Sequence, residues 1–203
     1  LFRSLTALRG GWAMQTLGQN VETDWRLILV NRDNPLPEDF TVDLLTLTNG
    51  EAVDRRIYPD LQKMFDDARS AGIHPTVWEG YRTREEQEAM MEKYIEDYQA
   101  EGYSRSEAEL LAGERVARPG TSEHELGLAV DINAPEGEES QAVYDYLAAH
   151  AWEYGFILRY PAGKENITGI EFEPWHYRYV GTEAAREIYK KGQTMEEYLG
   201  AVP

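Results

Sequence analysis

The sequence predicts an α+β fold, a single domain in which helices pack against a mainly antiparallel central sheet. Three observations support this prediction. The chain has 203 residues, the length of one domain. Hydrophobic residues make up 42% of it, which is enough for a sizeable core. Helical and strand-like patterns are mixed along the chain, without the regular strand–helix–strand alternation that builds parallel sheets.

The composition narrows the classes of function. The formal net charge of −17 repels nucleic-acid phosphates and argues against DNA or RNA binding. The absence of cysteine excludes thiol nucleophiles, disulfides and cysteine metal sites. No run reaches the roughly 18 apolar residues that a membrane helix needs. The chain begins at Leu1, so we expect that a signal or anchor segment, if the protein has one, lies outside it.

Hydrophobic period and turn residues define the elements of the first third of the chain. Residues 1–25 have no clear period and are left unassigned as an N-terminal extension, with the domain proper expected over 26–203. The run "WRLILV" (Trp25 to Val30) predicts a strand, and "NRDNPLPEDF" after it a turn-rich loop. Apolar spacing predicts a helix over Leu61 to Ala68, with Gly72 as its stop.

The next segments alternate between strand and helix. The run "PTVWEGY" predicts a strand that leads into a loop. Thr83 and Glu86 then form a capping box that begins a helix. A second helix is expected over roughly 105–116. The apolar face of the first of these helices carries Met90, Met91, Tyr94, Ile95 and Tyr98, with the two methionines expected to fill core space.

The last third of the chain also mixes both kinds of element. Val143 and Leu147 predict a helix that Gly155 ends. The runs "GFILRY" and "IEFEPWHYRYV" are typical of strands. Thr182 and Thr194 are expected to cap two short C-terminal helices, the second through a capping box with a glutamate.

The segment "GTSEHELGLAVDINAP" combines a strand pattern with two potential metal ligands. Bulky residues at period two, over 126–132, predict one buried face of a strand. The other face offers only Gly127, Ala129 and the carboxylate of Asp131. The helical zinc motif H-E-x-x-H is excluded, because Leu128 stands where its second histidine belongs.

His124 and Asp131 can share a metal ion only if the chain bends between them. Seven extended steps would span roughly 23 Å, whereas two ligands of one ion lie within a few ångströms of each other. We therefore expect a bend near Gly127. A plainer alternative is an ion-paired or capping histidine followed by an ordinary aspartate at a strand end.

The run "EFEPWHYRYVG" supplies the groups that this pair lacks. Pro174 cannot donate to a sheet, so the strand is expected to be kinked or at an edge there, which can point Glu173 and His176 into one cavity. Zinc in hydrolases takes three protein ligands and leaves a position for water. His124, Asp131 and His176 would be the three ligands, a set that suits zinc without excluding other divalent ions. Glu173 would be the base, or alternatively the partner of a nearby arginine.

Taken together, these segments resemble the VanY-type zinc D-alanyl-D-alanine carboxypeptidases. These enzymes trim bacterial peptidoglycan stem peptides and belong to the hedgehog/D-Ala-D-Ala peptidase superfamily. The family pattern S-x-H-x-x-G-x-A-x-D begins at Ser122, and the pattern E-x-W-H begins at Glu173. The run "EGYRTREEQ" resembles an upstream family block and holds Arg82 and Gln87. The resemblance covers roughly residues 36–200, with all blocks in family order.

The resemblance implies one zinc ion on the three ligands named above, with Glu173 as catalytic base. It also implies that Arg82 stabilises the oxyanion of the scissile peptide, as a fixed guanidinium can do in a shielded site. Without the resemblance, Arg82 could be a surface arginine before a helix. The implied substrate contacts are Ser122, Gln87 and Tyr160, of which Ser122 could equally be a local turn former.

The remaining histidines and aromatic residues are expected to have structural roles. His74 and His150 lie outside the motifs, and we expect both to be structural or solvent-exposed. Trp175 and Tyr177 flank His176 and are expected to hold it by packing.

The expected function is removal of a C-terminal D-alanine from peptidoglycan stem peptides by metal-activated water. We expect a monomer in the bacterial envelope or outside the cell. A D,D-carboxypeptidase acting on pentapeptides and an L,D-carboxypeptidase acting on tetrapeptides would use the same residues, and an endopeptidase is a third possibility. The alternative from another class is a non-catalytic, zinc-containing module that binds peptides.

Overall fold

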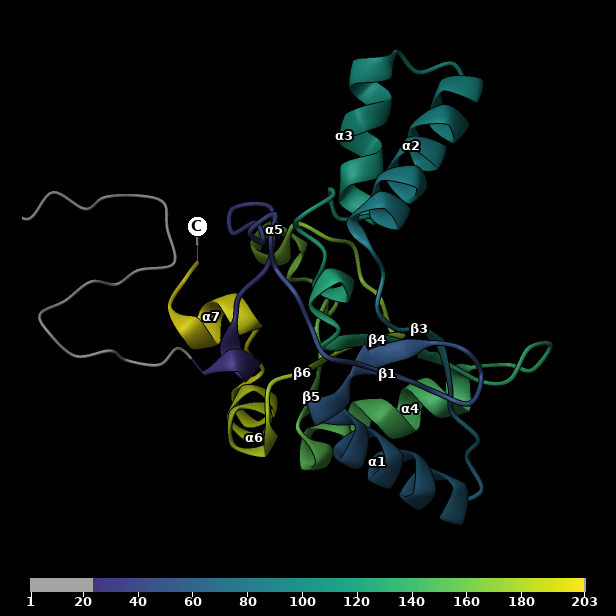
Figure 1. Cartoon of the computed structure of the whole chain (residues 1–203), viewed down its shortest axis with the longest axis vertical. Coiled ribbons are helices and arrows are strands. Elements are labelled where there is room, and N and C mark those ends of the chain that lie inside the picture. The colour runs from purple at the N-terminus through teal and green to yellow at the C-terminus, as the bar shows by residue number, and fades with distance from the viewer. Residues whose placement is uncertain (1–23, 203) are drawn as a thin grey trace, which may run out of the picture.

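The computed structural model describes residues 24–202 and has the expected α+β architecture (Figure 1). Its central sheet is antiparallel throughout, with the strand order β3-β4-β6-β5. These strands are β3 (Thr76–Glu79), β4 (Ala129–Asn133), β5 (Phe156–Leu158) and β6 (His176–Tyr179). A second, two-stranded antiparallel sheet consists of β1 (Leu44–Thr46) and β2 (Ala52–Asp54).

Helices surround the central sheet. In Figure 1, α1 and α4 lie together at one end of the molecule, and the hairpin of α2 and α3 projects from the other. The α-helices are α1 (Tyr58–Ser70), α2 (Arg84–Ala100), α3 (Arg105–Arg115), α4 (Gln141–His150), α5 (Glu165–Thr168), α6 (Thr182–Lys191) and α7 (Met195–Leu199). Short 3-10 helices are η1 (Trp25–Leu27), η2 (Arg55–Ile57), η3 (Glu123–Leu126) and η4 (Ala151–Tyr154). Within the described part, none of the helices combines the length and apolar character needed to span a bilayer.

The two faces of the sheet have different roles. Val130 and Ile132 of β4 are fully buried in the main core, together with Met64 of α1 and Leu147 of α4. Because side chains alternate along a strand, Asp131 points to the opposite face. The division into a bulky face and a small-residue face that the sequence predicts is therefore confirmed.

Strand register brings polar residues together on that second face. Asp131 lies opposite His176 in the pairing of β4 with β6. On the other side of β4, it lies opposite Glu79 of β3. Three neighbouring strands thus place an acidic or imidazole side chain at the same level of the sheet.

Local capping signals predicted several helices well. α1 covers the expected Leu61 to Ala68, and Gly72 follows it with the positive φ of a stop residue. The capping box of Thr83 and Glu86 begins α2 with both reciprocal hydrogen bonds present. A capping box at Thr194 begins α7 in the same way.

Two expected elements differ from the structure. The segment Trp25 to Val30 is not a strand: Asp24 caps the short helix η1, and the carbonyls of Arg26 and Ile28 accept hydrogen bonds from the Arg178 side chain. These carbonyls are satisfied by a buried guanidinium rather than by a neighbouring strand. Thr182 is not a cap either, because it is the first residue of α6 and the cap position is occupied by a glycine with no side chain to bond.

Two other expected strands are shorter than predicted. The buried run over 126–132 becomes strand only at Ala129, since Leu126 is the last residue of η3 and Gly127 caps that helix in the left-handed region. The run "IEFEPWHYRYV" becomes strand only at His176, because Pro174 and Trp175 form a turn. Both departures occur where a functional side chain is redirected. Of the expected N-terminal extension, residues 1–23 lie outside the described residues.

Candidate active site

The expected bend between His124 and Asp131 is present at Gly127. Gly127 has a φ of +69° in the left-handed region, and a Cβ there would come within 3.0 Å of the backbone nitrogen of Asp54. The chain turns there from η3 into β4. This turn brings His124 Nε2 to 3.4 Å from Asp131 Oδ1.

His176 reaches the same carboxylate from β6. Its Nδ1 lies 3.1 Å from Asp131 Oδ1, as the register of the two strands requires. The turn at Pro174 closes with a hydrogen bond of 3.3 Å from the His176 amide to the Glu173 carbonyl. This turn places Glu173 Oε2 3.6 Å from His176 Nδ1. A tight turn, rather than a kinked strand, therefore points both side chains into one cavity.

The three side chains fit the ligand set of one zinc ion. One ligand atom each from His124, Asp131 and His176 lies within 4.8 Å of the others. Asp131 Oδ1 is buried and has no hydrogen-bond partner in the described part of the chain, so a cation would satisfy it. The Nδ1 atom of His124 lies 2.7 Å from the carbonyl oxygen of Gly80 and donates to it, which leaves the Nε2 lone pair free for a metal.

Electrostatics at this point of the molecule favour positive charge. Burial lowers the pKa of His176, but the carboxylates of Asp131 and Glu123 outweigh burial and raise it to about 10. Burial raises the pKa of Asp131, and the two imidazoles outweigh it and hold that pKa below its usual range. A divalent cation supplies the positive charge that the carboxylates demand without protonating the ligands.

Glu173 has the environment of a general acid–base group. Burial raises its pKa to about 7, and the negative charge of Asp131 acts in the same direction. The opposing charges of His176, His124 and Arg82 are not enough to cancel this effect. A carboxyl group with a pKa near neutrality can both accept and return a proton under physiological conditions.

Arg82 is buried and held from two sides. Its Nε donates to Glu79 Oε1 at 2.6 Å, and a second nitrogen pairs with the other oxygen of the same carboxylate. Its Nη1 donates to Gln87 Oε1 at 2.5 Å. Gln87 is itself fixed, because its Nε2 donates to the Ala117 carbonyl at 2.6 Å. The guanidinium is therefore pre-positioned at the cavity wall.

Two further predicted residues have defined places. The Ser122 hydroxyl accepts from the His124 amide and caps η3, which is the local turn role that the sequence left open. The Tyr160 ring is buried with its centroid 4.8 Å from that of His176. Trp175 lies at the cavity, whereas Tyr177 points to the opposite face of β6. His74 and His150 are exposed, as expected.

One cavity of about 180 Å³ gathers all eight predicted site residues. α2 and α3 add Met90, Tyr94 and Arg115 to its wall, which sequence reasoning did not assign to the site. Glu79, the partner of Arg82, was also missed, although its position three residues before Arg82 is a weak signal for such a pair. The predicted residues that line the cavity are Arg82, Gln87, Ser122, His124, Asp131, Tyr160, Glu173 and His176.

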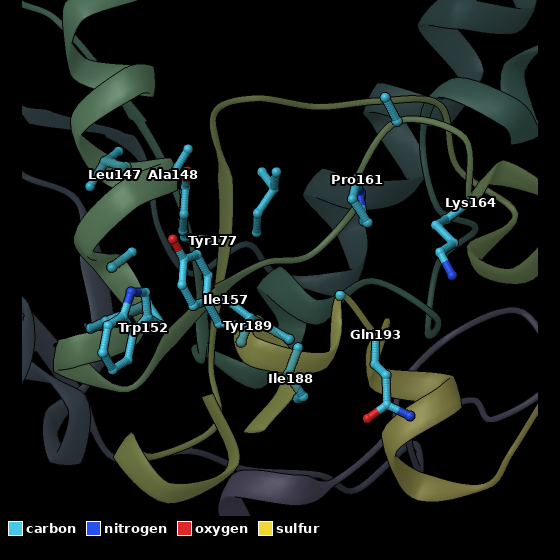
Figure 2. A pocket seen from close by; sticks show the side chains of 15 residues that line it. Leu147, Ala148, Trp152, Ile157, Pro161, Lys164, Tyr177, Ile188, Tyr189 and Gln193 are labelled. Carbon is cyan, nitrogen blue, oxygen red and sulfur yellow. The ribbon is translucent and has the colours of Figure 1, made fainter. Parts of the chain in front are cut away.

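A second cavity, of about 280 Å³, lies between α4, β5 and α6 (Figure 2). Its lining is mainly apolar and includes Trp152, Ile157 and Tyr189, with Lys164 as its one charged residue among those the structure describes. Tyr177 borders it, so it lies across β6 from the side chain of His176. Its lining lacks the acid, base and metal ligands that hydrolysis needs, so we place the chemistry in the first cavity.

Known proteins share both the sequence and this architecture. The family model for VanY D-alanyl-D-alanine carboxypeptidase matches residues 50–182. A D-alanyl-D-alanine carboxypeptidase of Enterococcus faecalis is 52% identical over 183 residues, which cover 89% of this chain and 68% of that protein.

Two solved structures are similar over nearly their whole length. VanYB in complex with D-alanine-D-alanine is 51% identical with a TM-score of 0.85, over 87% of this chain and 98% of that one. A mutant VanY D,D-pentapeptidase from a VanB-type resistance cassette, in complex with Zn(II), has a TM-score of 0.84 at 51% identity, over 87% and 99%. With the family model matching more than half of its residues, this chain belongs to the VanY family of D-alanyl-D-alanine carboxypeptidases.

Proposed function

We propose that this protein is a zinc-dependent carboxypeptidase that removes the C-terminal D-alanine from peptidoglycan stem peptides. The observation that carries the proposal is the gathering of His124, Asp131, His176 and Glu173 around one cavity. Family membership and the similarity to a VanY protein in complex with Zn(II) support the same reading.

In this proposal His124, Asp131 and His176 hold a single zinc ion. When bound, zinc polarises the scissile carbonyl and lowers the pKa of water. The hydrogen bond from His124 Nδ1 to the Gly80 carbonyl fixes the ring so that Nε2 faces Asp131. The buried Oδ1 of Asp131 lies between the two imidazoles and supplies the negative charge that they share.

Glu173 moves the proton in the proposed reaction. Its carboxylate takes a proton from water as the water oxygen attacks the carbonyl carbon of the last peptide bond. The same proton then passes to the nitrogen of the departing D-alanine as the carbon–nitrogen bond breaks. A pKa near 7 suits both transfers, because the group is neither a strong acid nor fully protonated at neutral pH.

Arg82 is proposed to stabilise the negative charge that develops on the carbonyl oxygen. Its two supports, Glu79 and Gln87, fix the guanidinium before substrate arrives, so little reorganisation is needed during the reaction. Gln87 thus supports Arg82 besides lining the cavity. Tyr160 and Ser122 stay predicted substrate contacts on the cavity wall.

The substrate class places the proposed reaction outside the cytoplasm, at the bacterial cell wall. The formal net charge of −17 argues against a nucleic-acid partner, because it repels phosphates. That the protein is a monomer stays a prediction.

Mass spectrometry of stem peptides tests the proposal. Zinc-loaded protein is incubated with a pentapeptide ending in D-Ala-D-Ala and, separately, with the corresponding tetrapeptide. We expect loss of one alanine from the pentapeptide and none from the tetrapeptide. A Glu173→Gln protein prepared in parallel controls for contaminating peptidases.

The other outcomes separate the alternatives. Cleavage of the tetrapeptide alone would identify an L,D-carboxypeptidase. No cleavage of either peptide by protein with confirmed zinc would contradict the carboxypeptidase and favour an endopeptidase or a peptide-binding module.

A further inference from the structure

His124 and His176 differ in what contacts the ring nitrogen that points away from Asp131. His124 has a backbone acceptor, the Gly80 carbonyl, for the ring nitrogen that points away from the site. The corresponding atom of His176 is Nε2, because its Nδ1 faces Asp131. His176 Nε2 is buried and has no hydrogen-bond partner among the residues described. A buried ring nitrogen without a partner is costly, so an acceptor is expected beside it.

Glu123 is the group that lies there. Its Oε2 is 3.7 Å from His176 Nε2 and also lacks a hydrogen-bond partner in the described structure. The other oxygen, Oε1, accepts from Arg159 Nε and Arg178 Nη1, each at 2.8 Å. All three of these charged side chains are fully buried. Oε1 of Glu123 thus accepts two hydrogen bonds from arginines, and Oε2 faces His176.

We propose that Glu123 is a positioning residue whose Oε2 accepts the Nε2 proton of His176. His176 Nε2 and Glu123 Oε2 are 3.7 Å apart, which is less than 1 Å longer than a hydrogen bond. A small rotation of the imidazole would bring the two atoms within hydrogen-bond distance. With the proton held on Nε2, the lone pair of Nδ1 faces Asp131 and is available to the metal. This inference rests on the proposed function, in which His176 is a zinc ligand.

The surrounding network explains why Glu123 cannot move away. Arg159 donates to both oxygens of Glu196 on α7, at 3.0 and 2.6 Å. Arg178 donates to the carbonyls of Arg26 and Ile28 at the start of the described chain. The two arginines and two glutamates balance in charge, and they connect His176 to segments near both ends of the described residues. α7 and η1 thus contact the arginines that hold Glu123, although neither element lines the cavity.

The first test uses the zinc-loaded protein with its network intact. Histidine is labelled with ¹⁵N, and the exposed His74 and His150 are replaced by glutamine to simplify the spectrum. Proton–nitrogen correlation then shows which ring nitrogen of His176 carries the proton. We expect Nε2–H on His176 and Nδ1–H on His124. A proton on Nδ1 of His176 overturns the inference.

The second test compares Glu123→Gln with Glu196→Gln, two isosteric changes in the same network. In Glu123→Gln the amide oxygen is needed to accept from the two arginines, so the NH₂ group faces the Nε2–H of His176. Both of these groups are hydrogen-bond donors, so no hydrogen bond can form between them. We expect zinc affinity, measured by chelator competition, to fall about 10- to 100-fold. Glu196→Gln should lower the melting temperature yet keep zinc affinity within about threefold, because Glu196 does not face His176.

The remaining outcomes of this comparison overturn the inference. Unchanged zinc affinity in Glu123→Gln shows that His176 needs no help from this carboxylate. Equal losses of affinity in both variants show a general loosening of the core instead of positioning. Failure of the unaltered protein to bind zinc would refute the proposed function itself, so the two failures are distinguishable.

Discussion

The two walls of the catalytic cavity are built by different physical means. On the sheet side, Asp131 and His176 are cross-strand neighbours, and Glu123 behind them is fixed by two fully buried arginines. On the opposite side, the α2–α3 hairpin projects from the body (Figure 1) and packs through a small apolar cluster of its own. Its ion pairs, such as Arg105 with Glu92, are half-exposed.

This difference in rigidity suggests that the sheet side serves the reaction and the hairpin side serves substrate recognition. Breaking a buried ion pair leaves an uncompensated charge and costs several kcal/mol, so the sheet side tolerates little displacement. Exposed pairs contribute little, and a satellite cluster is less firmly held than the main core. We infer that the sheet side fixes the metal ligands, while the hairpin beyond Gln87, the residue that holds Arg82, supplies an adaptable wall for the substrate.

The largest effect is expected at the centre of the sheet side. Asp131→Asn removes the charge that both imidazoles share, so bound zinc and activity should be lost together, the latter by about 10³-fold or more. Zinc content and turnover of a pentapeptide measure both. Asp145→Asn, on the exposed surface of α4, is the matched control. Full activity in Asp131→Asn would refute this ligand set.

The next effect concerns a group that is fixed but binds no metal. Arg82→Lys keeps the charge but loses the fork that grips Glu79 and Gln87. We expect kcat/KM for the pentapeptide to fall by about 10²-fold while zinc content stays normal, because the loss is confined to transition-state stabilisation. An unchanged kcat/KM would mean that Arg82 has only a structural role.

A smaller effect is expected on the hairpin side. Tyr94 of α2 lines the cavity and is partly exposed, so Tyr94→Ala should raise KM a few-fold and leave kcat and zinc content unaltered. Tyr103→Ala is the control, since that exposed ring lies at the far end of the same hairpin. A large fall in kcat in Tyr94→Ala would show that this part of the hairpin takes part in the reaction, and would contradict the distinction between the two walls.

The smallest effect is expected from the exposed ion pairs. Arg105→Ala removes contacts to Glu92 and Glu109 on the surface of the hairpin. Because solvent and salt screen such pairs, the melting temperature and the kinetics should both stay within experimental error. A marked destabilisation, read by thermal unfolding, would show that the hairpin is held more firmly than its exposure indicates.

The sequence predicted which residues gather at the cavity better than it predicted the residues that support them. Local spacing was enough for the bend at Gly127 and the capping box at Thr83, because each depends on residues close together in the chain. His176 lies far from His124 and Asp131 in the sequence, and it was joined to them by the chemistry of zinc sites and the resemblance to a known family. The structure brings the three side chains together.

Glu79 was missed although Arg82 follows it closely, because that spacing alone is a weak signal. Glu123 was missed, since its role depends on partners that only the folded chain brings near.

The wrong strand at Trp25 to Val30 has the same origin. Its hydrophobic pattern suits a strand, but the pattern cannot reveal that Arg178, about 150 positions later, satisfies its carbonyls. The turn at Pro174 was predicted as a kink, and only the hydrogen bond from His176 to Glu173 defines its form.

The most direct test of the whole account is the zinc content and turnover of Glu173→Gln, measured on the same preparation. Glu173 lies beside the proposed ligands without being one of them, and the acid–base role proposed for it would account for about 10²- to 10⁴-fold in rate. We predict one zinc per chain, as in the unaltered protein, with D-alanine release reduced by that factor. Retained activity, or loss of zinc together with activity, would contradict the separation of base from ligands on which the account depends.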